Sequence, residues 1–257
     1  MRNRIYFFTG TGNSLWVAKE IASKTPDCDI VAIRKDMDMT VPAGLERLGF
    51  VVPTYAWAQP LMVADFFRTA VFPKQGRTYV FAVATSGGLA FNAVPQAKAL
   101  LSEKGVSLNY GASLTMYRNS VLSYKMGQDA AKLAAQSAKR AAPVIDDIVN
   151  KRDKRIGNLN KFLLRLHVDF MKDIPETGSG YQVSGDCVSC GLCAAVCPAK
   201  NITMKDGKPE FQRRCERCVA CIQHCPKRAI DYKGETQNRG RYAHPQIITG
   251  ELAKFYE

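Results

Sequence analysis

Eight of the nine cysteines fall in two copies of one pattern near the C-terminal end of the chain. Residues 187–198 read C-x-x-C-x-x-C-x-x-x-C-P, and residues 215–226 repeat this pattern 28 residues later. A tight loop can wrap three thiols spaced in this way around one inorganic centre, while the fourth thiol comes from farther away. This part of the chain is therefore expected to fold around its cysteines.

The double pattern is the one by which bacterial ferredoxins hold [4Fe–4S] clusters. In two-cluster ferredoxins, the fourth cysteine of each run binds the cluster of the other run. The resemblance implies one cluster bound by Cys187, Cys190, Cys193 and Cys225. It implies a second cluster bound by Cys215, Cys218, Cys221 and Cys197. Ile202 and Ile230 are also 28 residues apart, which predicts equivalent core positions in the two halves.

Structural zinc and disulfides are the alternatives for these cysteines. Zinc takes four ligands, typically as two C-x-x-C pairs, and does not require this longer run twice. Disulfides are typical of secreted proteins, but the apolar run within residues 1–8 is too short for a signal peptide. Pro53 and Pro60 interrupt the most apolar stretch, so no integral membrane segment is expected. The pattern favours clusters in a cytoplasmic protein.

The N-terminal half alternates two kinds of apolar pattern. Short apolar runs typical of buried strands cover residues 4–8, 30–33, 48–52, 78–84 and 107–116. Apolar residues at helical spacing fill the segments 15–22, 61–70 and 91–104. This alternation predicts an α/β domain with a parallel sheet wrapped on both faces.

The loop after the first expected strand predicts a phosphate site. Its glycines allow close backbone approach, its polar side chains offer donors, and the N-terminus of the next helix adds backbone N–H groups. The loop has no lysine, which excludes a Walker motif, and Leu15 replaces the third glycine of a dinucleotide-binding motif. An ordinary capped turn is the alternative. The loop residues are Thr9, Gly10, Thr11, Gly12, Asn13 and Ser14.

This loop resembles the flavodoxin loop that binds the phosphate of FMN, and two further loops match flavodoxins in position. One follows the third strand, where flavodoxins place an aromatic residue beside the isoalloxazine ring: Pro53, Thr54, Tyr55, Ala56 and Trp57. The other follows the fourth strand, where they close over the other side of the ring: Thr85, Ser86, Gly87 and Gly88. Ligands bind such sheets at these strand ends. The alternatives are interface packing for the two aromatic residues and a plain turn for residues 85–88.

The whole chain resembles the flavodoxin–ferredoxin fusion proteins of anaerobic bacteria and archaea. This resemblance implies a flavodoxin-like doubly wound parallel five-stranded sheet in residues 1–118. It implies a small α+β domain with two [4Fe–4S] clusters in residues 178–233. The implied cofactors are FMN and these two clusters.

Two segments match neither domain. Residues 119–177 predict a helical connector, in which Pro143 should kink or divide a helix over residues 128–149. One face of a second connector helix carries Leu159, Phe162, Leu163, Leu166 and Phe170. A helix that lies on a membrane surface is the alternative. Residues 234–257 form a C-terminal tail, which we expect to pack near the domain junction.

The implied function is electron transfer by an iron–sulfur flavoprotein. Electrons would pass between a low-potential donor, the clusters and FMN, which converts one-electron to two-electron transfer. The chain would act as an electron-transfer protein or as a ferredoxin-dependent reductase. No hydrolytic triad or paired carboxylates are discernible, so no catalytic residue is assigned. The alternative is a redox sensor or assembly module that uses the same cofactors without steady turnover.

The charge of the chain bears on its partners. The net charge is +13, which suits an acidic redox protein such as a ferredoxin. The basic residues are dispersed and no nucleic-acid motif occurs, so nucleic-acid binding is not expected. The acceptor, a small molecule or a protein, is left open. We expect the nearer cluster beside residues 55–57 or 85–88, within one chain or across a homodimer.

Overall fold

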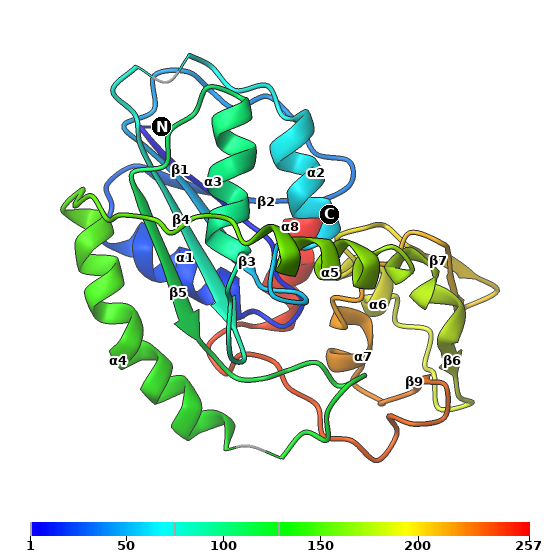
Figure 1. The fold of residues 1–257 in the computed structure, drawn as a ribbon. Coiled ribbons are helices and arrows are strands. Elements are labelled where there is room, and N and C mark those ends of the chain that lie inside the picture. Colours follow the sequence, from blue (N-terminus) through cyan, green and yellow to red (C-terminus); the bar gives the residue numbers. More distant parts are fainter. Residues whose placement is uncertain (1, 75, 128) are drawn as a thin grey trace.

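A five-stranded parallel sheet forms the centre of the N-terminal half (Figure 1). The structure is a computed structural model that describes residues 2–74, 76–127 and 129–257. Its strands are β1 (Asn3–Phe7), β2 (Cys28–Ala32), β3 (Arg47–Pro53), β4 (Tyr79–Ser86) and β5 (Tyr110–Thr115). They lie in the order β2-β1-β3-β4-β5, which is the flavodoxin-like order. The predicted α/β fold is therefore confirmed.

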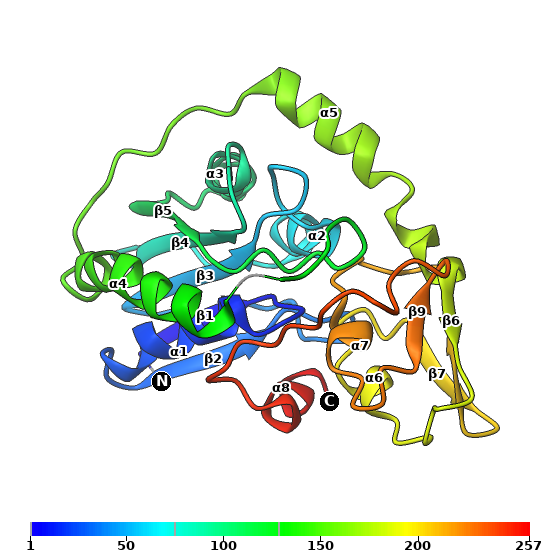
Figure 2. The same ribbon diagram turned by 90° about the horizontal axis from the view of Figure 1, so that it is seen from below.

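Helices cover both faces of this sheet (Figure 2). On one face, the core joins the sheet to α1 (Asn13–Ser23), α4 (Ala130–Val149) and α8 (Thr249–Tyr256). On the other face, it joins the sheet to α2 (Leu61–Thr69) and α3 (Ala93–Glu103). All eight residues of β4 are buried. Burial on both faces explains why the strands read as continuous apolar runs.

The helix α4 departs from the sequence prediction. Pro143 lies inside one continuous helix of 20 residues and does not divide it. Pro143 and Lys139 are both exposed, so water can hydrate the carbonyl group that the proline leaves without a donor. The predicted start of this helix, Gln128, lies outside the described residues.

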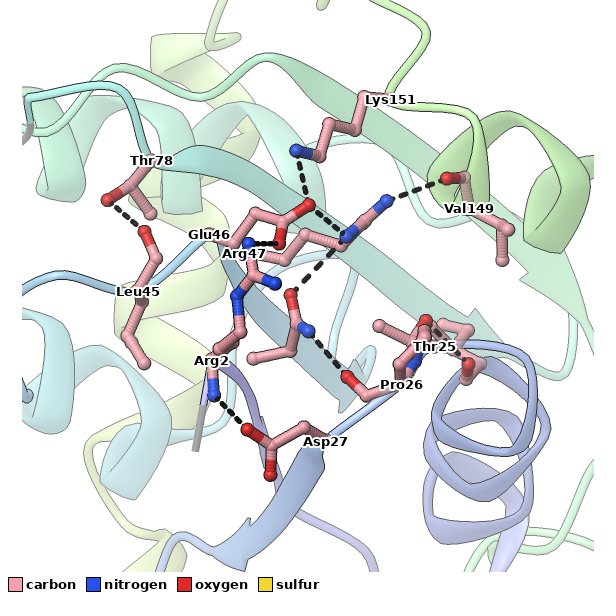
Figure 3. A network of polar contacts seen from close by, with 12 residues as sticks. Arg2, Thr25, Pro26, Asp27, Leu45, Glu46, Arg47, Thr78, Val149 and Lys151 are labelled. Carbon is pink, nitrogen blue, oxygen red and sulfur yellow. Dashed lines mark hydrogen bonds and ion pairs between the residues drawn. The ribbon is translucent and has the colours of Figure 1, made fainter.

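A polar network fixes the end of α4 at the amino ends of the strands (Figure 3). The guanidinium of Arg47 donates to the carbonyl oxygen of Val149 over 2.8 Å and to Glu46 over 2.9 Å. Lys151, just after α4, pairs with the same Glu46 carboxylate at 2.6 Å. The predicted cofactor loops lie at the opposite edge of the sheet, where the strands end.

The second connector helix, α5 (Lys161–Met171), stands outside the layer of α2 and α3 (Figure 2). Its predicted apolar stripe faces solvent, because Phe162 is 70% exposed and Phe170 is 53% exposed. The buried residues of α5 are His167 and Met171. Contact with the body of the protein therefore uses a different helix face from the predicted one.

The cysteine-rich part is a small α+β unit with an internal repeat. A short 3-10 helix, η1 (Ile174–Gly180), precedes it. Strand β6 (Tyr181–Val183) pairs with β9 (Ile230–Tyr232), and β7 (Ile202–Lys205) pairs with β8 (Lys208–Phe211). The short helices α6 (Leu192–Ala195) and α7 (Ala220–Gln223) begin 28 residues apart. Ile202 and Ile230 are both buried, which confirms their predicted equivalence.

Across residues 2–74, 76–127 and 129–257, every helix is too short or too polar to cross a lipid bilayer.

Candidate functional site

The first cysteine run lies around a cavity of about 370 Å³, part of it open to solvent, which we call the outer cavity. Its thiols come from Cys187, Cys190, Cys193 and Cys225. Cys190 is exposed, and the other three are partly buried. The fourth thiol, from Cys225, belongs to the second run, so this cavity joins both halves of the repeat.

The second run lies around the inner cavity, which has a volume of about 320 Å³, part of it open to solvent. Its thiols come from Cys197, Cys215, Cys218 and Cys221, and three of these residues are buried. Tyr181 and Glu216 also line this cavity. The eight cysteines thus come together in the two sets that the crossover implies.

Buried thiols in these cavities need a cation in order to lose their protons. Burial raises the pKa of the Cys193 thiol to about 11 and that of Cys215 to about 12. Backbone N–H groups point at several sulfurs: Asn201 donates to Cys197, and Ala229 donates to Cys225, both over 3.3 Å. Such N–H···S bonds stabilise ligating thiolates.

The cysteine geometry also bears on the zinc alternative. Among the described residues, no three His, Cys, Asp or Glu side chains gather closely enough to share one ion. A cubane cluster binds each thiolate at a different iron, so its ligands need not converge on a single point. The two donor sets fit clusters of this kind.

The loop between β1 and α1 has the properties of an anion site. Gly12 adopts a left-handed φ of 94°, which glycine tolerates without strain, and its N–H donates to Thr9 Oγ1 over 3.0 Å. In the part of the chain that the structure describes, the backbone N–H groups of Thr11, Asn13 and Ser14 find no acceptor. These donors are buried at a helix N-terminus, where an anion satisfies them.

Two hydroxyl protons at this loop remain free for a ligand. Thr11 Oγ1 accepts from the amide of Asn119, so its own proton remains available. Ser14 Oγ and Thr85 Oγ1 lie 2.9 Å apart, and one proton serves this bond, which leaves the other. All three hydroxyl-bearing residues are buried. The loop therefore offers neutral donors for a phosphate.

The three loops predicted to hold FMN surround one cavity of about 380 Å³, which we call the loop cavity. Among their residues, the following line it: Thr9, Gly10, Thr11, Asn13, Ser14, Pro53, Thr54, Tyr55, Thr85, Ser86 and Gly87. Gly12, Ala56, Trp57 and Gly88 do not line it. Tyr117, Asn119 and Cys218 complete the lining, which carries no Lys or Arg.

A buried side-chain oxygen in the wall of the loop cavity also has no partner among the described residues. Thr54 Oγ1 is buried and makes no hydrogen bond. A buried hydroxyl of this kind costs free energy unless a ligand or water satisfies it. The orphaned hydroxyl, the unpaired N–H groups and the neutral lining together fit a phosphate-bearing, largely uncharged ligand such as FMN.

The loop after β3 contains a strained turn. Residues 55–58 close on themselves, because Tyr55 and Ala58 exchange backbone hydrogen bonds of 2.9 and 3.0 Å. The two central residues have positive φ values, 42° for Ala56 and 69° for Trp57. Left-handed backbone costs a non-glycine residue roughly 1–2 kcal/mol, so neighbouring contacts must hold this turn in place.

The ferredoxin-like unit packs directly on the phosphate loop. A Cβ atom on Gly10 would lie 1.9 Å from the carbonyl oxygen of Cys218, so only glycine fits there. His224 Nε2 lies 3.1 Å from the carbonyl oxygen of Gly10, and its Nδ1 lies 2.9 Å from the hydroxyl of Thr249. Burial lowers the pKa of His224, and a neutral ring donates from Nε2 to Gly10 and accepts from Thr249.

A second contact between the two parts lies at α2. The backbone N–H of Met62 donates over 3.1 Å to the carboxylate of Glu216, which stands between two cysteines of the second run. Glu216 is buried, and burial raises its pKa to about 7. One backbone N–H of the first turn of α2 is thus satisfied by a residue that also lines the inner cavity.

The C-terminal tail holds the other side of the phosphate loop. The buried hydroxyl of Tyr256 donates to the carbonyl oxygen of Thr9 over 2.7 Å and accepts from the Thr9 N–H over 3.1 Å. Tyr242 donates to Asn13 Oδ1 over 2.7 Å and stacks on Tyr117 at 4.0 Å. The tail therefore packs near the domain junction, as predicted.

Sequence reasoning did not identify these contacts. His224, Tyr242 and Tyr256 bond to residues 214, 229 and 247 positions away. Contacts of such separation leave no periodic pattern in the sequence. The nearest signal was the position of His224 directly before a ligand cysteine.

Comparisons with known proteins identify the cysteine-rich unit as similar to iron–sulfur proteins. Residues 180–239 match the family described as 4Fe-4S dicluster domain. An uncharacterized polyferredoxin-like protein of Methanocaldococcus jannaschii is 39% identical over 59 residues, which are 23% of this chain and 26% of that protein. A ferredoxin of Pyrobaculum islandicum is 30% identical over 78 residues, which are 28% of this chain and 73% of that protein. The chain thus spans about a quarter of the polyferredoxin-like relative and most of the ferredoxin.

The N-terminal part has a weaker match among solved structures. A flavodoxin of Streptococcus pneumoniae TIGR4 aligns with 58% of this chain and 98% of its own length, at 16% identity and a TM-score of 0.40. The flavodoxin-like fold rests on the strand order, not on this match. The dicluster domain gives the chain an iron–sulfur, electron-transfer role. The chain belongs to the ferredoxins through residues 180–239, which match the 4Fe-4S dicluster domain, and it is a fusion of this unit with a flavodoxin-like domain.

Proposed function

We propose that this chain is an iron–sulfur flavoprotein in which two [4Fe–4S] clusters exchange electrons with FMN. One cluster occupies the outer cavity, the other occupies the inner cavity, and FMN occupies the loop cavity. The observation that carries this proposal is the position of Cys218, which lines both the inner cavity and the loop cavity. A single cysteine therefore separates the inner cluster from the flavin.

The packing around Cys218 supports close electronic contact. The Cys218 carbonyl oxygen touches Gly10 of the phosphate loop, and the residue packs with the apolar core that includes Tyr55. Electrons that pass between the inner cluster and the flavin, in either direction, would cross this contact. The nearer cluster is then the one held by Cys197, Cys215, Cys218 and Cys221.

The outer cavity is the proposed point of electron exchange with a partner. Cys190 is exposed there, and Val188 beside it is 55% exposed. Lys227 lines this cavity, and Lys208 donates to the carbonyl oxygen of Cys187 over 3.1 Å. Exposed lysines at a redox centre favour an acidic partner. An acidic redox protein such as a ferredoxin is therefore the proposed donor or acceptor.

The residues of the loop cavity would hold FMN by neutral hydrogen bonds. The free donors of Thr11, Asn13 and Ser14 would bind the phosphate, and Thr54 and Tyr55 would lie beside the ring. FMN would supply the junction between one-electron and two-electron transfer. With the second electron acceptor left open, the chain is an electron-transfer protein or a ferredoxin-dependent reductase. In this scheme residues 1–118 and 178–233 form the two redox domains, joined by the connector of residues 119–177.

Cofactor content tests the proposal most simply. Protein purified without oxygen should contain about eight iron atoms, eight acid-labile sulfides and one FMN per chain. Four iron atoms, or zinc in their place, would contradict the cluster assignment. Steady consumption of electrons with an added acceptor would favour a carrier or reductase, whereas a titration that stops at stoichiometric reduction would favour a sensor.

The phosphate loop has its own control. Thr11→Ala combined with Ser14→Ala should weaken FMN binding by roughly tenfold or more, because two hydroxyl donors are lost, while the iron content stays unchanged. Riboflavin, which lacks the phosphate, should bind both proteins weakly and about equally. Equal affinity of the unaltered protein for FMN and riboflavin would refute the phosphate site.

A further inference from the structure

The turn formed by residues 55–58, defined by its two left-handed central residues, has an unusual sequence. Positive φ at both central positions is the pattern of a type I′ turn, which strongly prefers asparagine and glycine. Here the central residues are Ala56 and Trp57. Because the local sequence does not favour this conformation, contacts from elsewhere in the chain must select it.

Both carbonyl groups of the strained residues are held by hydrogen bonds. The carbonyl oxygen of Ala56 lies 3.1 Å from Nδ1 of His167, and that of Trp57 accepts from the N–H of Asn92 over 2.8 Å. Asn92 in turn exchanges two hydrogen bonds with Asn160, the residue that caps α5. The helix α5 thus reaches the turn directly through His167 and indirectly through Asn92.

His167 is suited to this contact in position and in protonation. It is 3% exposed, while most of α5 faces solvent. A carbonyl oxygen can only accept, so Nδ1 of His167 must carry the proton. Burial lowers the pKa of His167, which favours the neutral ring.

We propose that His167 is a positioning residue of the flavin site: its Nδ1–H holds the turn of residues 55–58 in the left-handed conformation that places Tyr55 in the wall of the loop cavity. This inference rests on the proposed function, because it assigns a role in holding FMN to a residue of the connector. The connector is therefore part of the flavin site and not only a link between domains. His167 acts through the turn and does not line the cavity itself.

Two substitutions at position 167 separate the hydrogen bond from the mere presence of a polar side chain. In His167→Asn, the amide nitrogen takes the place of Nδ1 and can still donate to Ala56. In His167→Gln, the amide reaches the place of Nε2 and the bond is lost. We expect His167→Gln to weaken FMN binding about tenfold and His167→Asn to change it by less than about threefold. Val168→Ala, at an exposed position of the same helix, is the matched control.

A second readout reports on the turn without any cofactor. The chain has two tryptophans, so fluorine NMR of protein labelled with 5-fluorotryptophan gives one signal for Trp57 and an internal reference from the buried Trp16. In flavin-free protein, His167→Gln should shift or broaden the Trp57 signal and leave that of Trp16 unchanged. This measurement tests the role of His167 in the turn even if the loop cavity binds a ligand other than FMN.

Relief of the strain provides a rescue. Glycine tolerates positive φ, so Ala56→Gly should make the turn less dependent on His167. In the Ala56→Gly background, His167→Gln should then weaken FMN binding by less than about threefold. A purely structural role of His167 in α5 predicts no such rescue.

The proposal is overturned if His167→Gln leaves both the Trp57 signal and FMN affinity unchanged, or if Ala56→Gly rescues nothing. If His167→Gln shifts the Trp57 signal as expected but the unaltered protein binds no FMN, only the flavin assignment is refuted.

Discussion

The outer and inner cavities are built from the same motif but differ in their surroundings. Cys190 of the outer cavity is exposed, whereas the equivalent position of the second run, Cys218, faces the flavodoxin-like domain. The outer cavity is bordered by Lys227 and the inner cavity by Tyr181 and the buried Glu216. The repeat therefore determines which cysteines line each cavity, and the docking of the second run against the flavodoxin-like domain determines which cavity is the inner one.

Docking also explains why the two runs are not interchangeable. Arg217, in the second run, lies over the ring of Phe170 on α5 at 5.7 Å, and Glu216 satisfies one backbone N–H of the first turn of α2. In the first run, by contrast, Val188 is exposed, and so is Met204, which also lines the outer cavity. In the proposed function, this asymmetry would give the protein one end for exchange with partners and one end for exchange with its flavin.

The largest expected effects come from the cysteines. Replacing one ligand with serine should remove or convert one cluster, so the iron content should fall from about eight toward about four per chain. With the crossover, Cys197→Ser should give the same electron paramagnetic resonance spectrum as Cys221→Ser. Cys225→Ser should match Cys190→Ser. A Cys197→Ser spectrum that instead resembles that of Cys190→Ser would show that each run binds its own cluster.

A smaller effect is expected at the contact between the inner cavity and the phosphate loop. In Gly10→Ala, the new methyl group would meet the Cys218 carbonyl oxygen, which should lower the free energy of unfolding by about 1–3 kcal/mol. FMN binding should weaken in the same variant. Gly88→Ala is the control, because no heavy atom lies within 4 Å of its added Cβ. Chemical denaturation compares the two, and equal stability would indicate that the domains do not touch at Gly10.

The smallest expected effect concerns the tail. Tyr256→Phe removes one hydroxyl that both donates to and accepts from the backbone of Thr9, which should cost about 1–2 kcal/mol of unfolding free energy. The loss should also weaken FMN binding, because Thr9 begins the phosphate loop. Tyr124→Phe, at a position that is 46% exposed, should have no measurable effect. Unchanged FMN affinity in Tyr256→Phe would show that the tail does not contribute to FMN binding.

Much of the fold was accessible from local patterns. The apolar runs predicted the sheet because its strands are buried on both faces. The two donor sets followed from the resemblance of the cysteine runs to two-cluster ferredoxins, because the fourth cysteine of each set comes from the other run. The helix α4 continued through Pro143, since its exposed side tolerates an unpaired carbonyl group. The outward stripe of Phe162 and Phe170 was predictable as a helix face but not as an exposed one. Its exposure depends on how α5 meets the turn at residues 55–58.

The candidate site was accessible only in part, for a physical reason. The three loops of the loop cavity follow strands and carry their own signals in the sequence. His167, His224 and Tyr256 contribute through single hydrogen bonds to distant backbone atoms, and such bonds require no particular neighbouring residues. Only the folded chain reveals them.

The order of the two cavities is the central claim, and rapid mixing tests it most directly. Reduced ferredoxin would be mixed without oxygen with the unaltered protein, with Cys190→Ser and with Cys221→Ser, while cluster and flavin absorbance are followed separately. We predict that flavin reduction follows cluster bleaching in the unaltered protein and becomes far slower in Cys221→Ser, even though the outer cluster remains. Flavin reduction at an unchanged rate in Cys221→Ser would contradict the inner cluster as the route to the flavin.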